Sequence, residues 1–160
     1  MRTFALMAAM TLLVVSFGCS KAAPVGSSLA LDMVVGGKAM RLIDNAPSIQ
    51  LFNGALTVKS KSGTEDGNNV QLIIVQAGAV APGDFVVSPT GSVVVSFSMP
   101  GVATQFPFEM GTATLTSAQW FAGGAVSGQL KNLFSHANSF GLAPETTASG
   151  TFALIIQSAQ

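Results

Sequence analysis

The chain has 160 residues, of which 49% are hydrophobic and only 9% are charged, and its formal net charge is zero. This balance excludes a nucleic-acid-binding surface, which would need a patch or stripe of Lys and Arg. It also excludes intrinsic disorder, which combines high charge with few apolar residues.

The N-terminus has the pattern of an export signal. Arg2 supplies a positive charge, and residues 4–17 are apolar except for Thr11 and Ser16. This segment is shorter than the ~20 apolar residues of a membrane-spanning helix, and it fits the roughly 7–15 residues of a signal peptide's hydrophobic region. We therefore expect a helical signal peptide at 1–18 that does not belong to the folded domain.

Cys19 is the only cysteine of the chain, so no intrachain disulfide can form. A free thiol is a liability in an oxidising exported compartment, whereas a cysteine at this position is what lipid attachment requires. The tetrapeptide Ser16-Phe17-Gly18-Cys19 resembles the lipobox of bacterial lipoprotein precursors, in which Leu, a small residue, Gly or Ala, and Cys follow one another. Gly18 and Cys19 match this pattern, whereas Ser16 and Phe17 depart from it.

The resemblance implies that the thiol of Cys19 receives a diacylglycerol and that cleavage makes Cys19 the first mature residue. The membrane would then be a partner through the lipid anchor, since two or more acyl chains hold a protein stably. Enterobacterial lipoproteins that are retained at the inner membrane tend to have Asp directly after the lipidated cysteine. Here this position holds Ser20, which favours the outer membrane. The alternative is cleavage after Ser20-Lys21-Ala22, which would release a soluble secreted or periplasmic protein.

Residues 19–28 are predicted to comprise the lipidated cysteine and a short flexible tether, and residues 29–160 a single β domain. Within the domain, Gly, Pro and Asn separate short apolar runs, a pattern typical of sandwiches and barrels. We expect an all-β fold, an antiparallel two-sheet β-sandwich. A closed β-barrel is the alternative, because periodicity does not distinguish the two.

The predicted strands, in chain order, cover residues 29–35, 40–43, 49–52, 55–61, 70–76, 85–87, 92–98, 102–109, 112–117, 126–131 and 151–157. Several of them alternate between apolar and polar residues, as a half-buried strand does. The run at 70–76 is apolar on both faces and predicts a central strand. Pro107 predicts a sheet edge for 102–109, because proline donates no hydrogen bond to a neighbouring strand. One short helical turn is expected around Leu133 and Phe134.

The C-terminal half resembles the small, uncharacterised β-rich lipoproteins of bacterial genomes. The resemblance is carried by Gly-Thr-Ala-Thr-Leu-Thr at 111–116, Ser-Gly-Gln-Leu at 127–130 and Ser-Gly-Thr-Phe at 149–152, preceded by Gly83-Asp84-Phe85. It spans residues 70–158 and implies a β-rich fold without assigning a functional residue.

Groups that could carry catalysis or bind a metal are sparse. His136 is the only histidine, and a general base also needs a nucleophile and an orienting acid close in space. A zinc site needs three or four protein ligands, and the loop Glu65-Asp66-Gly67-Asn68-Asn69 lacks the ligand spacing of an EF-hand. We therefore predict a non-enzymatic protein without a metal or other cofactor.

Trp120 and Phe121 are the predicted ligand-binding residues, because adjacent aromatic side chains before Gly123-Gly124 can stack on a sugar or a partner. The competing interpretation is a tryptophan that caps the core. The sequence as a whole predicts a lipid-anchored cell-envelope lipoprotein with a structural or protein-binding role and an envelope protein as partner. The alternative is an envelope lipoprotein that binds a small ligand or a carbohydrate, for which an enclosed pocket would be the evidence.

Overall fold

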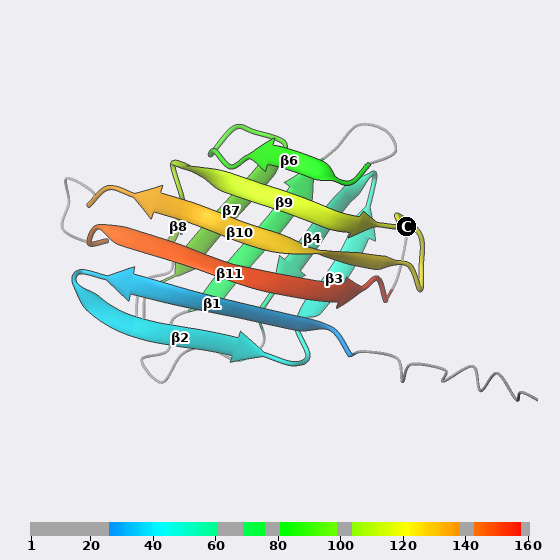
Figure 1. The fold of residues 1–160 in the computed structure, drawn as a ribbon, viewed down its shortest axis with the longest axis horizontal. Helices are drawn as coiled ribbons and strands as arrows, with labels where there is room; N and C mark the ends of the chain where they lie inside the picture. The colour runs from blue at the N-terminus through cyan, green and yellow to red at the C-terminus, as the bar shows by residue number, and fades with distance from the viewer. Residues whose placement is uncertain (1–25, 61–68, 76–80, 99–103, 138–142, 158–160) are drawn as a thin grey trace, which may run out of the picture.

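The computed structural model describes residues 26–60, 69–75, 81–98, 104–137 and 143–157. These residues form eleven strands in two antiparallel sheets and contain no helix (Figure 1). The expected all-β sandwich is confirmed, and the two sheets do not close into a barrel. The described residues include no helical segment that could cross a bilayer. The predicted signal peptide and Cys19 lie outside the described residues.

Sheet A has six strands in the order β2-β1-β11-β10-β9-β6. Their bounds are β1 (Ser28–Val35), β2 (Lys38–Asp44), β6 (Gly83–Val86), β9 (Met110–Ala118), β10 (Ala125–Ser135) and β11 (Thr146–Ile155). The first and last strands are neighbours, because β1 pairs with β11 over its whole length. Two strands far apart in the sequence therefore lie side by side in the middle of this sheet.

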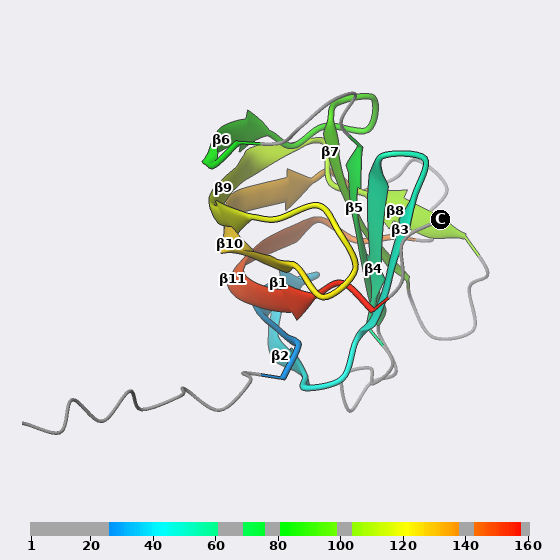
Figure 2. The same ribbon diagram turned by 90° about the vertical axis from the view of Figure 1, so that its right-hand side faces the viewer.

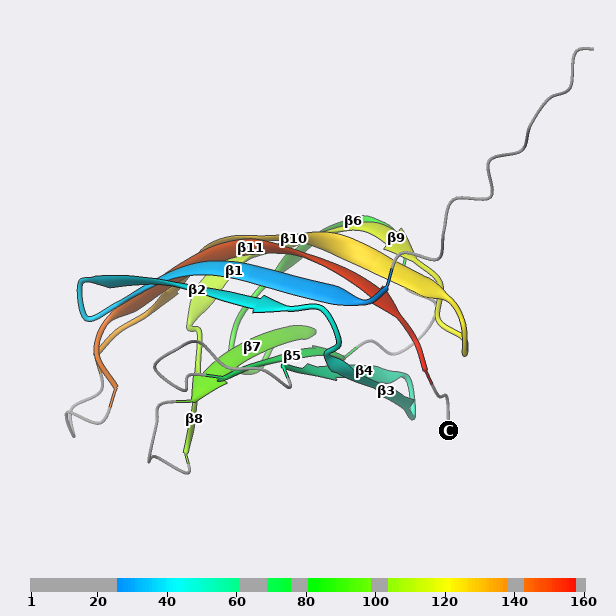
Figure 3. The same ribbon diagram turned by 90° about the horizontal axis from the view of Figure 1, so that it is seen from below.

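Sheet B has five strands in the order β3-β4-β5-β7-β8. Their bounds are β3 (Ser48–Phe52), β4 (Ala55–Lys59), β5 (Asn69–Val75), β7 (Val93–Ser98) and β8 (Gln105–Pro107). The predicted central strand is β5, and the predicted edge strand with Pro107 is β8, so both placements are confirmed. Sheet A arches over sheet B, and the strands of the two layers cross obliquely (Figures 2 and 3).

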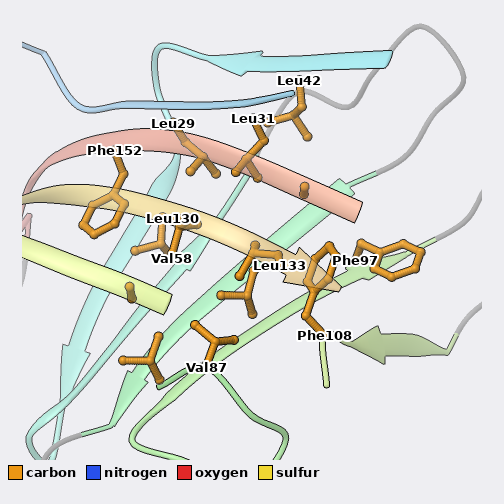
Figure 4. Packing of buried hydrophobic residues seen from close by; sticks show 14 of the residues in the cluster. Leu29, Leu31, Leu42, Val58, Val87, Phe97, Phe108, Leu130, Leu133 and Phe152 are labelled. Carbon is orange, nitrogen blue, oxygen red and sulfur yellow. The ribbon is translucent and has the colours of Figure 1, made fainter. Parts of the chain in front are cut away.

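The core lies between the sheets and is built by strand alternation. In β1, Leu29, Leu31, Met33 and Val35 point inward and are buried, as their spacing predicts. Sheet B contributes Phe97, whose ring centroid lies 5.7 Å from that of Phe106 and 5.3 Å from that of Phe108. Figure 4 shows side chains from both layers meeting in this space. Burying each large apolar side chain contributes roughly 1.5–3 kcal/mol, so this shared core holds the layers together.

Two local predictions are wrong. The residues expected to form a helical turn, Leu133 and Phe134, belong to β10, which continues to Ser135 through a β-bulge. Asn132 adopts a φ of 52° at the bulge, and this left-handed backbone lets Leu133 turn inward three residues after Leu130. The last strand begins at Thr146, five residues before its predicted start.

The strands of sheet A run between two ends of the molecule, which we call the proximal and the distal end. The proximal end holds the start of β1, the end of β11 and the β9–β10 loop at 119–124, because Ser28 pairs with Ala153 and Ala125 pairs with Ile155. The backbone N–H of Ile155 donates to Oγ of Ser27, which fastens the segment before β1 to β11. The distal end holds the β1–β2 turn and the residues just before β9 and just after β10 (Figures 1 and 3).

Candidate functional site

An open hollow of about 840 Å³ lies across four strands of sheet A, in the half next to the distal end. Residues 32–34 of β1, 39–41 of β2, 132–134 of β10 and 147–149 of β11 line it. The side chains that alternate to the outer face include Asp32, Val34, Arg41, Phe134, Thr147 and Ser149. The hollow is therefore a feature of the outer sheet surface.

The polar groups of the hollow are nearly balanced in charge. Asp32 and Arg41 are cross-strand partners, and Nε of Arg41 lies 3.3 Å from Oδ1 of Asp32. Both side chains are exposed, so water screens the pair and its contribution to stability is small. Beside them, Val34, the cross-strand partner of Ala39, supplies an exposed apolar side chain. The surface thus offers hydrogen-bonding, ionic and apolar contacts together without a net field of one sign.

The β-bulge of β10 shapes one wall of the hollow. After Asn132 the alternation restarts, so Leu133 is buried and Phe134 faces outward, half-buried. The Phe134 ring meets the His136 ring edge-on, with centroids 4.7 Å apart and an interplanar angle of 87°. His136, which directly follows β10, therefore lies at the border of the hollow and is held by an aromatic contact with Phe134.

Glu109 is the acidic partner of His136. Its Oε2 lies 2.6 Å from Nδ1 of the ring, and its Oε1 accepts the backbone N–H of His136 at 3.3 Å. The ring hydrogen bond lowers the pKa of Glu109 below its ordinary value of 4.5, while desolvation opposes this effect. The backbone hydrogen bond and the charge of His136 lower the pKa further. The carboxylate is thus held ionised and fixes the orientation of the imidazole.

The orienting acid that a catalytic histidine needs is therefore present. No hydroxyl group among the described residues is hydrogen-bonded to the ring, and the adjacent Ser135 donates to the backbone carbonyl of His136 instead, at 3.5 Å. Among the described residues at this border, Glu109 and His136 form an acid–imidazole pair, and no nucleophilic side chain is hydrogen-bonded to the ring. Sequence reasoning found His136 but missed Glu109. The pairing of β9 with β10, which the sequence analysis did not predict, brings them together, because the two residues flank the open end of this hairpin.

The predicted ligand-binding residues Trp120 and Phe121 lie in the β9–β10 loop at the proximal end, away from the hollow. Trp120 is partly buried against the core, and its Nε1 is buried without a hydrogen-bond partner among the described residues. Phe121 is 57% exposed. The two side chains therefore have different environments, and their role in ligand binding stays a prediction.

Two further sequence-based candidates have no described geometry. Cys19 and the loop residues 65–68 lie outside the described ranges. Within those ranges, no three His, Cys, Asp or Glu side chains are grouped closely enough to bind a metal ion. No protein-family model, curated protein or solved structure gives a significant match to the chain.

Proposed function

We propose that the chain is a lipid-anchored lipoprotein of the bacterial cell envelope that acts as a non-enzymatic protein-binding module. In this proposal, Cys19 carries the lipid, the sandwich projects from the membrane, and another envelope protein binds at the outer-face hollow of sheet A. The outer membrane is the proposed location, on the basis of Ser20. The observation that carries the binding role is the position of the hollow on the sheet.

The start of β1, where the proposed tether joins the domain, and the hollow lie toward opposite ends of sheet A. Cys19 stands nine positions before Ser28, where β1 begins at the proximal end. The hollow occupies the half of the strands next to the distal end. A strand of the length of β10, with 11 residues, spans roughly 35 Å. A lipid at Cys19 would therefore join the domain at the end away from the hollow, which leaves the hollow accessible to another protein.

The shape of the hollow favours a macromolecular partner. A small-molecule pocket buries roughly 70–90% of the surface of its ligand. This hollow, by contrast, is open along one face of a sheet. Exposed Val34 lies beside the ion pair of Asp32 and Arg41, so the hollow offers a partner both apolar and polar contacts. Thr147 and Ser149 add uncharged hydroxyl groups from β11.

Site-specific photo-crosslinking in intact cells tests this role. Thr147 and Thr151 are both exposed on the outer face of β11, but only Thr147 lines the hollow. A photoreactive amino acid at position 147 is expected to give a discrete protein adduct, and the same amino acid at 151 is expected to give much less. Absence of adducts at 147, or equal adducts at both positions, would reject the hollow as the binding surface.

A small ligand or carbohydrate is the second candidate function. The volume of about 840 Å³ falls within the roughly 300–1,000 Å³ typical of ligand sites. The Phe134 ring, with Asn132 and Ser149 near it, offers an apolar face together with hydrogen-bonding groups. Native mass spectrometry of the purified protein distinguishes this alternative. A retained small molecule that is lost in Phe134→Ala, together with no protein adduct at 147, would favour it.

A further inference from the structure

We propose that the β9–β10 loop, with Phe121 at its tip, rests on the surface of the bilayer that holds the lipid of Cys19. This inference depends on the proposed lipidation and adds a second, non-covalent membrane contact made by the folded domain. The occupant of the loop surface is a phospholipid membrane.

The length of chain before β1 places the loop near the bilayer. Nine residues can span at most ~30 Å from Cys19 to Ser28. The loop lies at the same end of the sheet as Ser28, since its C-terminal neighbour Ala125 pairs with Ile155 and Ser28 pairs with Ala153. Figure 2, viewed toward this end, shows the loop beside the start of β1 and the end of β11. The anchor thus holds this end of sheet A close to the membrane.

The distribution of charge favours the same orientation. Four of the exposed charged side chains, Asp32, Lys38, Arg41 and Lys131, lie in the distal half of sheet A. In the described proximal half of this sheet, the charged residues are Asp44, which is 3% exposed, and Asp84, which lies on the edge strand β6 at the level of Ala30. An approach limited to the β9–β10 loop and the strand ends beside it therefore dehydrates no exposed charge of sheet A. Dehydrating charge is the main cost of bringing a protein surface into a membrane interface.

The loop has the chemistry of an interfacial contact. Residues 119–125 are uncharged, and Phe121 is the most exposed Phe or Trp among the described residues of sheet A and its connections. Ile43, next to Ala30 on the outer face, is also exposed at the proximal end. Aromatic and aliphatic side chains of this kind insert at the headgroup boundary, where Trp and Phe are favoured. The indole of Trp120 lies directly beside this contact in the sequence.

The loop is held rigidly in shape. The N–H of Gly124 donates to the carbonyl of Phe121 at 2.8 Å, and Gly123 and Gly124 exchange backbone hydrogen bonds with Ile156 at 2.7 and 3.0 Å. Gly124 is buried, and a Cβ there would collide with the carbonyl oxygen of Gln119. Because the loop is already ordered, membrane contact requires little further loss of conformational entropy.

Trp120 provides the test, because it is the only tryptophan in a chain without tyrosine. The full-length gene product is purified from membranes, its lipid is verified by mass spectrometry, and it is reconstituted into phosphatidylcholine–phosphatidylglycerol vesicles with or without brominated acyl chains. We expect Trp120 emission to be lost in the brominated vesicles. We expect Phe121→Gln to restore most of the emission and Met110→Gln, a half-exposed apolar residue at the distal end, to leave the quenching unchanged.

The outcomes separate the two proposals. A lipidated, vesicle-bound protein whose emission is the same in both kinds of vesicle overturns the loop contact and leaves the proposed function intact. Equal quenching in the wild type and Phe121→Gln also overturns it, because proximity through the tether alone would then account for the signal. A mass without lipid overturns the proposed function, and the loop contact that depends on it is rejected as well.

Discussion

The carboxylate of Glu109 lies 2.6 Å from the imidazole of His136 and closes the distal end of the β9–β10 hairpin. The backbone N–H of His136 donates to the same carboxylate, and the Phe134 ring packs edge-on against the imidazole. Three contacts therefore fix His136 at the border of the hollow, although the side chain itself is exposed.

This pair predicts a pH dependence. Because the pKa of Glu109 is lowered by folding, its stabilising effect is fully present above the ordinary glutamate pKa of 4.5 and is lost as the pH falls through the lowered value. His136→Ala removes the ring hydrogen bond, which is the main cause of the lowered pKa of Glu109. We therefore expect the variant to have a higher pKa for this carboxyl group, measured as the midpoint of a ¹³C NMR titration. The stability difference between wild type and His136→Ala in urea should shrink as the pH falls. A midpoint that does not move would show that the ring hydrogen bond is not made in solution.

Close packing of β11 on β1 predicts a cost for a single methyl group at Gly150. A Cβ there would collide with the carbonyl oxygen of Ala30 and lie 2.9 Å from Cα of Leu31. Gly150→Ala is expected to reduce the free energy of unfolding by roughly 1–3 kcal/mol, as overpacking does. Gly26→Ala is the matched control, because a Cβ at Gly26 would have no neighbouring atom within 4 Å. Equal urea midpoints for the two variants would contradict the close approach of these strands.

The aromatic cluster predicts a larger loss. Phe97 is fully buried and contacts Phe106 and Phe108, so Phe97→Ala leaves a cavity between the layers and is expected to cost about 3–5 kcal/mol. Phe52→Ala removes the same atoms from a side chain that is 59% exposed and should change stability by less than about 0.5 kcal/mol. Chemical denaturation monitored by circular dichroism measures both. Similar losses in the two variants would place Phe97 outside the core.

The sequence predicted the fold well where strands alternate strongly. The inward faces of β1 and β7 follow from Leu29, Leu31 and Met33 and from the alternation of Val93 with Val95, and all of these residues are buried. Pro107 gave a correct edge position because its missing N–H is a chemical constraint that no packing alters. Such features depend on the local chain alone.

The errors have a different physical origin. Leu130 and Leu133 have the three-residue spacing of a helix, but the spacing arises from a bulge whose left-handed residue is Asn132. The start of β11 lacks large apolar residues, since Thr146 and Ala148 fill the buried positions there. Small buried residues carry little hydrophobic signal, so the strand was predicted to begin too late.

The hollow was not predictable from the sequence. It requires β10, β11, β1 and β2 to be neighbours, and the pairing of β1 with β11 joins opposite ends of the chain. Alternation identifies the outer face of each strand but not which strands adjoin. Trp120 and Phe121 are adjacent in the sequence, yet the fold buries part of one and exposes the other.

The mass of the N-terminal peptide of the protein extracted from bacterial membranes tests the central claim most directly. We predict a mature chain that starts at Cys19 and carries the added mass of a diacylglycerol with its fatty acids. An unmodified mature chain that starts at Ala23, after cleavage behind Ala22, would contradict the anchor and leave an exported sandwich without a membrane attachment.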